Sequence, residues 1–152
     1  MTINDFEDVR IGEHLKASGL LDGFTDINGQ LKSAPALFYS EIDLTKLQAN
    51  QRAVLIRQVG GITNGDDEIF YSQYTYNISV FGRKGLQDSG IVKGYAKQIR
   101  QWLLENYNSE SQCIISISTR GVAGPFITDC DRRVYEISIN ARFDVDSSKY
   151  NS

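Results

Sequence analysis

The chain has 152 residues, a length suited to one domain with a sizeable core, and it is 41% hydrophobic and 23% charged. A formal net charge of -3 argues against a dedicated nucleic-acid-binding protein, which is usually basic. The sequence has no run of about twenty apolar residues, so we expect no membrane-spanning segment. The acidic N-terminus lacks the features of a signal peptide, which favours synthesis and retention in a cytoplasm.

The first element that the pattern predicts is an amphipathic helix over residues 2–21. Apolar residues recur there at roughly helical spacing, and Thr2 or Asn4 can cap its start. Gly19 and then Gly23 are expected to end it. His14 lies on this helix as the only histidine of the chain, so a metal site built on two histidines is excluded. We expect His14 to be a surface or packed helix residue.

Residues 22–51 are the least regular part of the chain. Turn-forming residues are followed by the apolar Leu37, Phe38 and Tyr39, and Pro35 forces the residue before it to be extended. A long irregular segment in a small domain is uncommon and usually functional. Two interpretations carry equal weight: an arm that docks on a neighbouring subunit, and a segment that packs on its own domain.

Two strands joined by a hairpin are expected over residues 53–59 and 68–82, because Asn64-Gly65 is a strong turn signal. The second strand alternates, which is typical of a half-buried antiparallel strand. Its apolar face carries Phe70, Tyr74, Tyr76, Ile78 and Val80, and its uncharged polar face carries Gln73, Thr75, Asn77 and Ser79. The hairpin turn is acidic, with Asp66, Asp67 and Glu68, and is most simply a solvated loop tip.

A second helix is expected over residues 90–107, after a basic loop at Arg83 and Lys84. Asp88 or Ser89 can cap its start. An apolar stripe predicts packing on the sheet; it consists of Ile91, Tyr95, Ile99 and Leu103, widened by Val92, Ala96 and Trp102. The opposite side carries a short basic stripe of Lys93, Lys97 and Arg100, which is either a solvated face or a partner-binding surface.

The last third of the chain predicts two more strands. Residues 113–119 form a short buried strand, residues 120–125 a glycine-rich connection, and residues 133–145 a long alternating strand. This last strand matches the one over 68–82 in length and pattern, so the two are expected to be sheet neighbours. Residues 147–152 are expected to be a flexible tail after a single domain over 1–146.

This element order predicts an α+β fold. We expect a two-layer sandwich in which helices pack on one face of a mainly antiparallel sheet of about four to five strands.

Catalytic motifs are missing from the sequence. Gly60-Gly61 is not followed by the Lys-Ser/Thr of a phosphate-binding loop, and neither a nucleophile elbow nor paired CxxC motifs occur. Asp129 and Asp131 are more simply a solvated strand edge than an acid/base pair. Cys113 and Cys130 are too few for a disulfide scaffold and are expected to be reduced thiols. We therefore expect no enzyme activity and no catalytic residue, metal or cofactor.

The sequence resembles the tail terminator proteins of long-tailed bacteriophages, the family of lambda minor tail protein U. The resemblance covers residues 52–145 and rests on AVLIRQVGG, YSQYTYNISVFG, IVKGYAKQIRQWLLENY, CIISIST and RRVYEISINARFDV. It implies a virion structural protein that forms a hexameric ring at the head-proximal end of the tail tube. Such a ring stops tube polymerisation and joins the tail to head-completion proteins, and DNA passes through its lumen without sequence readout. The chain departs from this family in its longer stretch before residue 53.

A subunit of a closed ring uses two different surface patches for its contacts. Opposite charges on separate surfaces suit such head-to-tail pairing. The candidate interface residues are Asp66, Asp67, Glu68, Gln73, Thr75, Asn77, Arg83, Lys84, Lys93, Lys97, Arg100 and Arg120. The 120–125 connection is a candidate to reach an adjacent ring or to line the lumen.

Three other interpretations stay open at this point. The nearest is another neck, head-closure or tail-completion protein. The second is a small enzyme on the same two-layer fold, which requires a deep polar pocket. The third is a single-stranded nucleic-acid binder that presents Tyr71 and Phe81 as stacking platforms.

Overall fold

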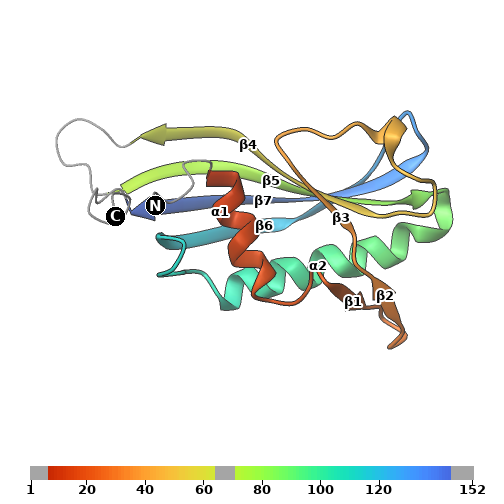
Figure 1. The fold of residues 1–152 in the computed structure, drawn as a ribbon, viewed down its shortest axis with the longest axis horizontal. Coiled ribbons are helices and arrows are strands. Elements are labelled where there is room, and N and C mark those ends of the chain that lie inside the picture. The colour runs from red at the N-terminus through yellow and green to blue at the C-terminus, as the bar shows by residue number, and fades with distance from the viewer. Residues whose placement is uncertain (1–6, 64–70, 145–152) are drawn as a thin grey trace.

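The long alternating strands of the sequence lie in the middle of a five-stranded sheet (Figure 1). The structure is a computed structural model, and it describes residues 7–63 and 71–144. Its elements in chain order are α1 (Glu7–Lys16), β1 (Gly23–Thr25), β2 (Leu31–Ser33), β3 (Ala36–Tyr39), the 3-10 helix η1 (Leu44–Lys46), β4 (Ala53–Thr63), β5 (Tyr71–Lys84), the 3-10 helix η2 (Leu86–Asp88), α2 (Ser89–Glu105), β6 (Ile114–Ile127) and β7 (Arg132–Asp144).

The predicted α+β class and mainly antiparallel sheet are confirmed. The strand order is β3-β4-β5-β7-β6, and β1 and β2 form a separate two-stranded hairpin. The pairs β4–β5, β5–β7 and β6–β7 are antiparallel, so the expected pairing of the two long strands is correct. The pair β3–β4 is parallel, a long-range pairing that the sequence pattern did not predict.

Both α-helices cover one face of the sheet, which we call the inner face (Figure 1). The alternation of β5 and β7 places their apolar side chains there, because successive strand residues point to opposite faces. The core at this face includes Ile11, Leu15, Tyr76, Ile78, Val80, Val92, Tyr95, Ala96, Ile99, Leu103, Ile137, Ile139, Ala141 and Phe143, each at most 1% exposed. The apolar stripe of α2 therefore packs as predicted, with Ile91 and Trp102 partly buried at its margin.

The first helix ends earlier than expected, at Lys16 rather than near Leu21. The Ser18 hydroxyl donates to Leu15 O over 2.6 Å, and Gly19 follows with a left-handed φ of 78°. Together these satisfy carbonyl groups at the helix end and turn the chain. The expected caps at Thr2 and Asn4 lie outside the described residues.

The single histidine joins the two helices. His14 Nε2 lies 2.7 Å from Asn106 O, just after α2, and the imidazole ring packs at a 50° tilt against the Trp102 ring, with the ring centroids 4.7 Å apart. Burial lowers the pKa of His14, and the hydrogen bond to Asn106 O offsets this only in part. His14 is thus a packed helix residue, one of the two roles expected for it.

The expected cap of α2 is wrong. Asp88 stands at the N-cap position but makes no side-chain capping bond. Its carboxylate instead accepts from Arg52 Nη2 at 2.6 Å, from Arg52 Nε at 2.8 Å and from Arg83 N at 2.9 Å. Ser89 Oγ lies 2.9 Å from Tyr135 Oη and does not cap either. The buried arginine competes successfully for the carboxylate because an unpaired buried charge costs several kcal/mol.

The glycine-rich connection over 120–125 is also wrong, because these residues lie inside the 14-residue strand β6. Register shifts between Thr119 and Val122, and between Ala123 and Phe126, let β6 keep pairing with β7 across the glycines. The turn between the two strands comes later, at residues 128–131. A loop that reaches an adjacent ring therefore does not exist at 120–125.

Most of the 22–51 segment packs on its own chain, whereas residues 27–31 are exposed. Leu37 and Tyr39 contact the inner core, whereas Phe38 packs in a second cluster on the opposite, outer face of the sheet. This cluster is formed by Ala53, Leu55, Phe81 and Val134, with Ala36, Phe38, Ile42, Leu44 and Leu47 around it. The segment between β3 and β4 covers that part of the sheet (Figure 1). Docking of this region on a neighbouring subunit stays a prediction.

One buried arginine holds that segment in place. The Arg132 side chain is fully buried, and its guanidinium donates to the carbonyl oxygens of Gln51, Gly82, Leu47 and Gln48 over 2.7–3.2 Å. Three of these four acceptors belong to the segment between β3 and β4. The planar fork of arginine suits several acceptors at once, so Arg132 ties this segment to the end of the sheet.

Candidate subunit interface on the outer face of the sheet

The polar side chains of β5 bond across the outer face to β7. Thr75 Oγ1 donates to Asn140 Oδ1 at 2.7 Å, and Arg142 Nε donates to Gln73 Oε1 at 3.3 Å. Asn77 Nδ2 and Ser79 Oγ both donate to Glu136 Oε2, at 3.1 and 3.3 Å. These pairs hold the side chains of the polar surface in place and satisfy part of their hydrogen-bonding capacity, which lowers the cost of covering them.

A groove lies beside this polar surface, and we call it the outer groove. Its volume is about 300 Å³. Its lining residues are Ile42, Leu44, Leu55, Arg57, Ser79, Phe81, Phe126, Thr128, Val134 and Glu136. Phe126 of β6 is 49% exposed at its edge, while Phe81 is only 7% exposed within the second cluster. A buried Phe81 is not free to stack a base, which removes one of the two platforms of a nucleic-acid binder.

The candidate interface residues of the sequence fall on separate surfaces. Gln73, Thr75 and Asn77 lie on the outer face as expected. Arg83 and Lys84 lie at the end of β5, where Arg83 is half-buried and Lys84 is exposed. The acidic turn of Asp66, Asp67 and Glu68 lies outside the described residues. The structure of a single chain leaves the role of all these residues as a prediction.

The basic stripe of α2 is only partly free. Lys93 and Lys97 are exposed on the helix, whereas Arg100 is half-buried and its Nε donates to Arg120 O over 2.8 Å. This bond ties α2 to the strand β6, at the edge of the sheet. Arg120 itself is exposed on β6. The structure therefore brings together two candidate interface residues, Arg100 and Arg120, which come from different elements of the chain.

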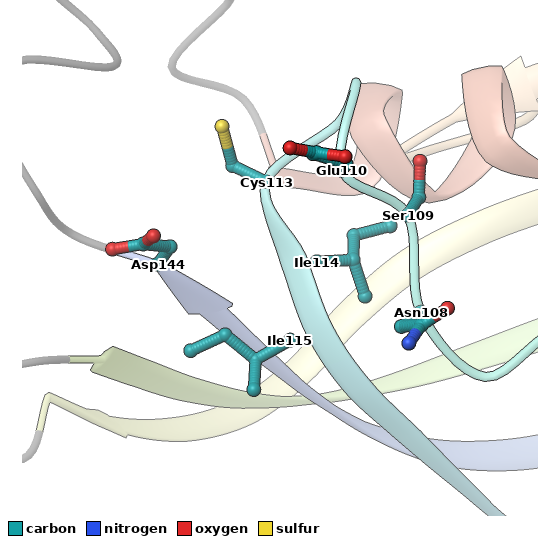
Figure 2. Close-up of a pocket in the computed structure, with 7 residues that line it drawn as sticks. All are labelled: Asn108, Ser109, Glu110, Cys113, Ile114, Ile115 and Asp144. Atoms are coloured by element: carbon teal, nitrogen blue, oxygen red, sulfur yellow. The ribbon is translucent and has the colours of Figure 1, made fainter.

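A second hollow, of about 340 Å³, lies at the other end of β6 (Figure 2). It is lined by Asn108, Ser109, Glu110, Cys113, Ile114, Ile115 and Asp144. Cys113 is buried and unbonded to sulfur, and the histidine that would activate a thiol is held instead by Asn106 and Trp102. No group of three or more metal-ligating side chains occurs among the described residues. This hollow thus lacks the parts of a nucleophilic site.

A family model for phage tail termination proteins matches residues 7–144 of the chain. This match spans every helix and strand that the structure describes. The chain belongs to the phage tail termination protein family. A search of individual curated proteins finds no match to this sequence.

Membership of the tail termination family makes this chain a structural component of the virion tail that interacts with tail and head components. The predicted resemblance to tail terminators is therefore confirmed at the level of the family, while the narrower likeness to lambda minor tail protein U stays a prediction. In the part of the chain that the structure describes, no helix is long and apolar enough to cross a membrane.

No local pattern in the sequence indicates the outer groove of this tail terminator. Leu44, Leu55 and Phe126 come from three distant segments, and only the parallel pairing of β3 and the bulges of β6 bring them together. Residues 36–47 contain more apolar side chains than one strand can bury against the inner core. This excess is a sequence feature that points to a second apolar surface.

Proposed function

We propose that this protein forms a ring at the head-proximal end of the phage tail tube. There it stops tube polymerisation and joins the tail to the head-completion proteins. Six copies close the ring in this proposal, and DNA passes through the lumen without sequence readout. The protein is made in the host cytoplasm and acts without catalysis, cofactor or metal. The observation that carries the proposal is the family match over residues 7–144.

The arrangement of the chain supports association through unlike surfaces. The outer face offers a polar surface and an apolar groove, and the opposite side offers the exposed Lys93 and Lys97 on α2. A ring needs such heterologous contacts, because each subunit meets its two neighbours through different patches. The candidate interface residues named from the sequence are proposed to serve these contacts and those with the tail tube.

Tube assembly tests the proposal. Purified tail tube protein is polymerised with and without this protein, and tube lengths are measured in negative-stain images. We expect shorter tubes that end in a ring of density. The Lys93→Glu/Lys97→Glu variant tests whether the basic stripe of α2 contributes, and Lys16→Glu/Lys46→Glu is its control with two other exposed lysines. Tubes of the same length and with the same ends in the presence and absence of the wild-type protein would contradict the proposal.

A further inference from the structure

The hairpin formed by β1 and β2 projects from the helix side of the molecule (Figure 1). Its tip carries two large apolar side chains, Ile27, which is 96% exposed, and Leu31, which is 81% exposed. Asn28, Gly29 and Gln30 lie between them and are also exposed. Single exposed apolar residues are ordinary on a protein surface, but two at the tip of one protruding turn are a candidate contact.

The turn at the tip is held in one conformation by its own hydrogen bonds. Asp26 Oδ1 accepts from Asn28 N at 2.9 Å and from Gln30 N at 2.8 Å, and Lys32 Nζ lies 3.5 Å from Asp26 Oδ2. Gly29 supplies the left-handed φ of 80° that the turn requires. The Asp26 charge is thus engaged inside the hairpin, and Ile27 and Leu31 are presented without an entropy cost for ordering the turn on binding.

The base of the hairpin is fixed to the helix layer. The Phe24 ring stacks on the Tyr95 ring of α2 at 4.0 Å, and Gln98 Nε2 donates to Thr25 O over 2.7 Å. Tyr95 Oη in turn donates to Leu20 O at 2.6 Å, just before the hairpin. The tip therefore stands at a fixed position relative to α2, as a rigid projection.

The outer groove matches this projection in chemistry. Its floor is apolar, with Leu44, Leu55, Phe81 and Val134, so it can take up aliphatic side chains. Its polar members are Arg57, Ser79 and Glu136, which offer both donors and acceptors. The amides of Asn28 and Gln30 beside the apolar pair can bond to either kind of group.

The two features lie on opposite sides of one chain. The β1–β2 hairpin lies against α2 on the helix side of the molecule (Figure 1). The lining of the outer groove includes Leu55, Phe81 and Val134 of the second cluster, so the groove lies on the opposite, outer face of the sheet. The sheet separates them, so a chain cannot fill its own groove with its own hairpin. A knob and a hole on different surfaces define a heterologous contact, which closes into a ring when the rotation between subunits allows it.

We propose that the tip of the β1–β2 hairpin, with Ile27 and Leu31, inserts into the outer groove of a second copy of this chain. This inference rests on the proposed ring, and it names the contact through which neighbouring subunits associate. In this contact one subunit contributes the hairpin, and its neighbour contributes the groove lined by residues 42–44 and Phe126.

Disulfide trapping tests the contact directly. Chains with Ile27→Cys are mixed with chains of a different tag that carry Phe126→Cys, both in a background with Cys113 and Cys130 replaced by alanine. Cross-linking requires Cα atoms within roughly 7 Å, so it reports proximity in the assembly. We expect a disulfide between unlike chains. Ile115→Cys is the matched control, since Ile115 is 45% exposed on the same strand but lies at the other hollow.

Sedimentation of the native-cysteine protein gives the second readout. The Ile27→Asp/Leu31→Asp variant is expected to associate roughly thirty-fold more weakly than wild type, with unchanged circular dichroism and Tm, because both residues are solvent-exposed. Leu86→Asp changes an apolar residue that is 66% exposed outside both surfaces, and it should associate normally.

The outcomes separate this contact from the ring itself. Wild-type assembly with no 27–126 cross-link, or with equal cross-linking at residue 115, overturns the contact and leaves the ring intact. A cross-link from residue 27 to the tail tube protein instead of a second copy overturns it as well. Wild-type protein that stays monomeric at high concentration, with no cross-link, counts against both the contact and self-assembly.

Discussion

Arg52 and Asp88 form a buried ion pair at the point where the sheet meets the second helix, with Arg52 Nη2 2.6 Å from Asp88 Oδ1. The side chains are 2% and 6% exposed, so neither charge is well solvated. Arg52 immediately precedes β4 and Asp88 immediately precedes α2. The pair therefore fixes the start of α2 against the start of β4.

Removing one member of this pair should destabilise the fold. We expect Asp88→Ala to lower the free energy of unfolding by about 3–5 kcal/mol, because it leaves the Arg52 charge buried and unpaired. The Arg52→Met/Asp88→Leu double variant should lose less than Asp88→Ala, since no uncompensated charge remains. Denaturant unfolding measures both, with the exposed Asp129→Asn as control. A double variant worse than the single one would contradict this account.

The same pair predicts loss of stability in acid. Burial alone would raise the pKa of Asp88, but the hydrogen bonds from Arg52 and Arg83 N, with the charges of both arginines, outweigh it and lower the pKa. A lowered folded-state pKa contributes stability above the unfolded value, near 3.9, and this is lost as pH falls through the folded value. Unfolding free energies between pH 5 and pH 2 should therefore fall more steeply for wild type than for Asp88→Ala. Parallel pH profiles would refute this.

The histidine gives a second pH dependence, in a higher range. Burial lowers the pKa of His14, with a smaller opposing effect from the bond to Asn106 O, so the unfolded chain binds this proton more tightly. Stability is therefore complete above the unfolded pKa of about 6.5 and declines as pH falls toward the folded value. His14→Gln should flatten the profile between pH 7 and pH 5. NMR titration of this single histidine measures the folded-state pKa directly, and a raised value would contradict the assignment.

Arg132 should control the order of the segment between β3 and β4. Arg132→Met removes the arginine donor from four main-chain carbonyls, of which Gln48 O keeps a bond from Gln51 N at 3.0 Å. Each buried carbonyl left unpaired costs about 1–3 kcal/mol. We expect faster hydrogen exchange at residues 47–51 than in wild type, and a lower Tm. The neighbouring Arg133→Met is the control, because Arg133 pairs with the exposed Asp131. Equal exchange in both variants would show that Arg132 does not hold this segment.

The close contact between Gly12 of α1 and Tyr39 of β3 predicts that a larger residue at position 12 destabilises the fold. A Cβ at Gly12 would lie 2.6 Å from Tyr39 Cζ, so Gly12→Ala should displace β3 and destabilise the fold by about 1–3 kcal/mol. Apart from neighbouring atoms of its own helix, no atom of the described residues lies within 4 Å of a Cβ built at Gly94 of α2, so Gly94→Ala should stabilise by up to about 1 kcal/mol. Tyr39→Ala should relieve the Gly12→Ala defect in a double-mutant cycle. Additive effects of Gly12→Ala and Tyr39→Ala would contradict this packing.

The sequence predicts the centre of this fold well for a physical reason. In β5 and β7 one face is buried against α2, so Tyr76, Ile78, Ile137 and Ile139 must alternate with polar residues. The full length of strand β6 could not be predicted in this way. Its bulges interrupt the two-residue alternation, and its glycines are typical of a turn. For this reason residues 120–125 were wrongly predicted to be a connection between two strands, although they lie inside β6.

The outer surface was predictable only in part. Gln73, Thr75 and Asn77 were placed on one face by alternation alone, and they lie there. The outer groove needs Leu44 and Phe126 side by side, and residues 82 positions apart leave no local pattern. The same holds for Arg52 and Asp88, which local reading of the sequence turned into a helix cap. Long-range pairing, rather than composition, decided both features.

If this protein caps the tail tube, as proposed, then a phage that lacks the protein should make tubes of the wrong length. Tails from infections with this gene deleted are imaged with and without purified protein added during assembly. Without the protein we expect overlong tubes that lack end rings and fail to join heads. Added protein should restore normal tube length, end rings and head joining. Tails of normal length that attach to heads without the protein would contradict it.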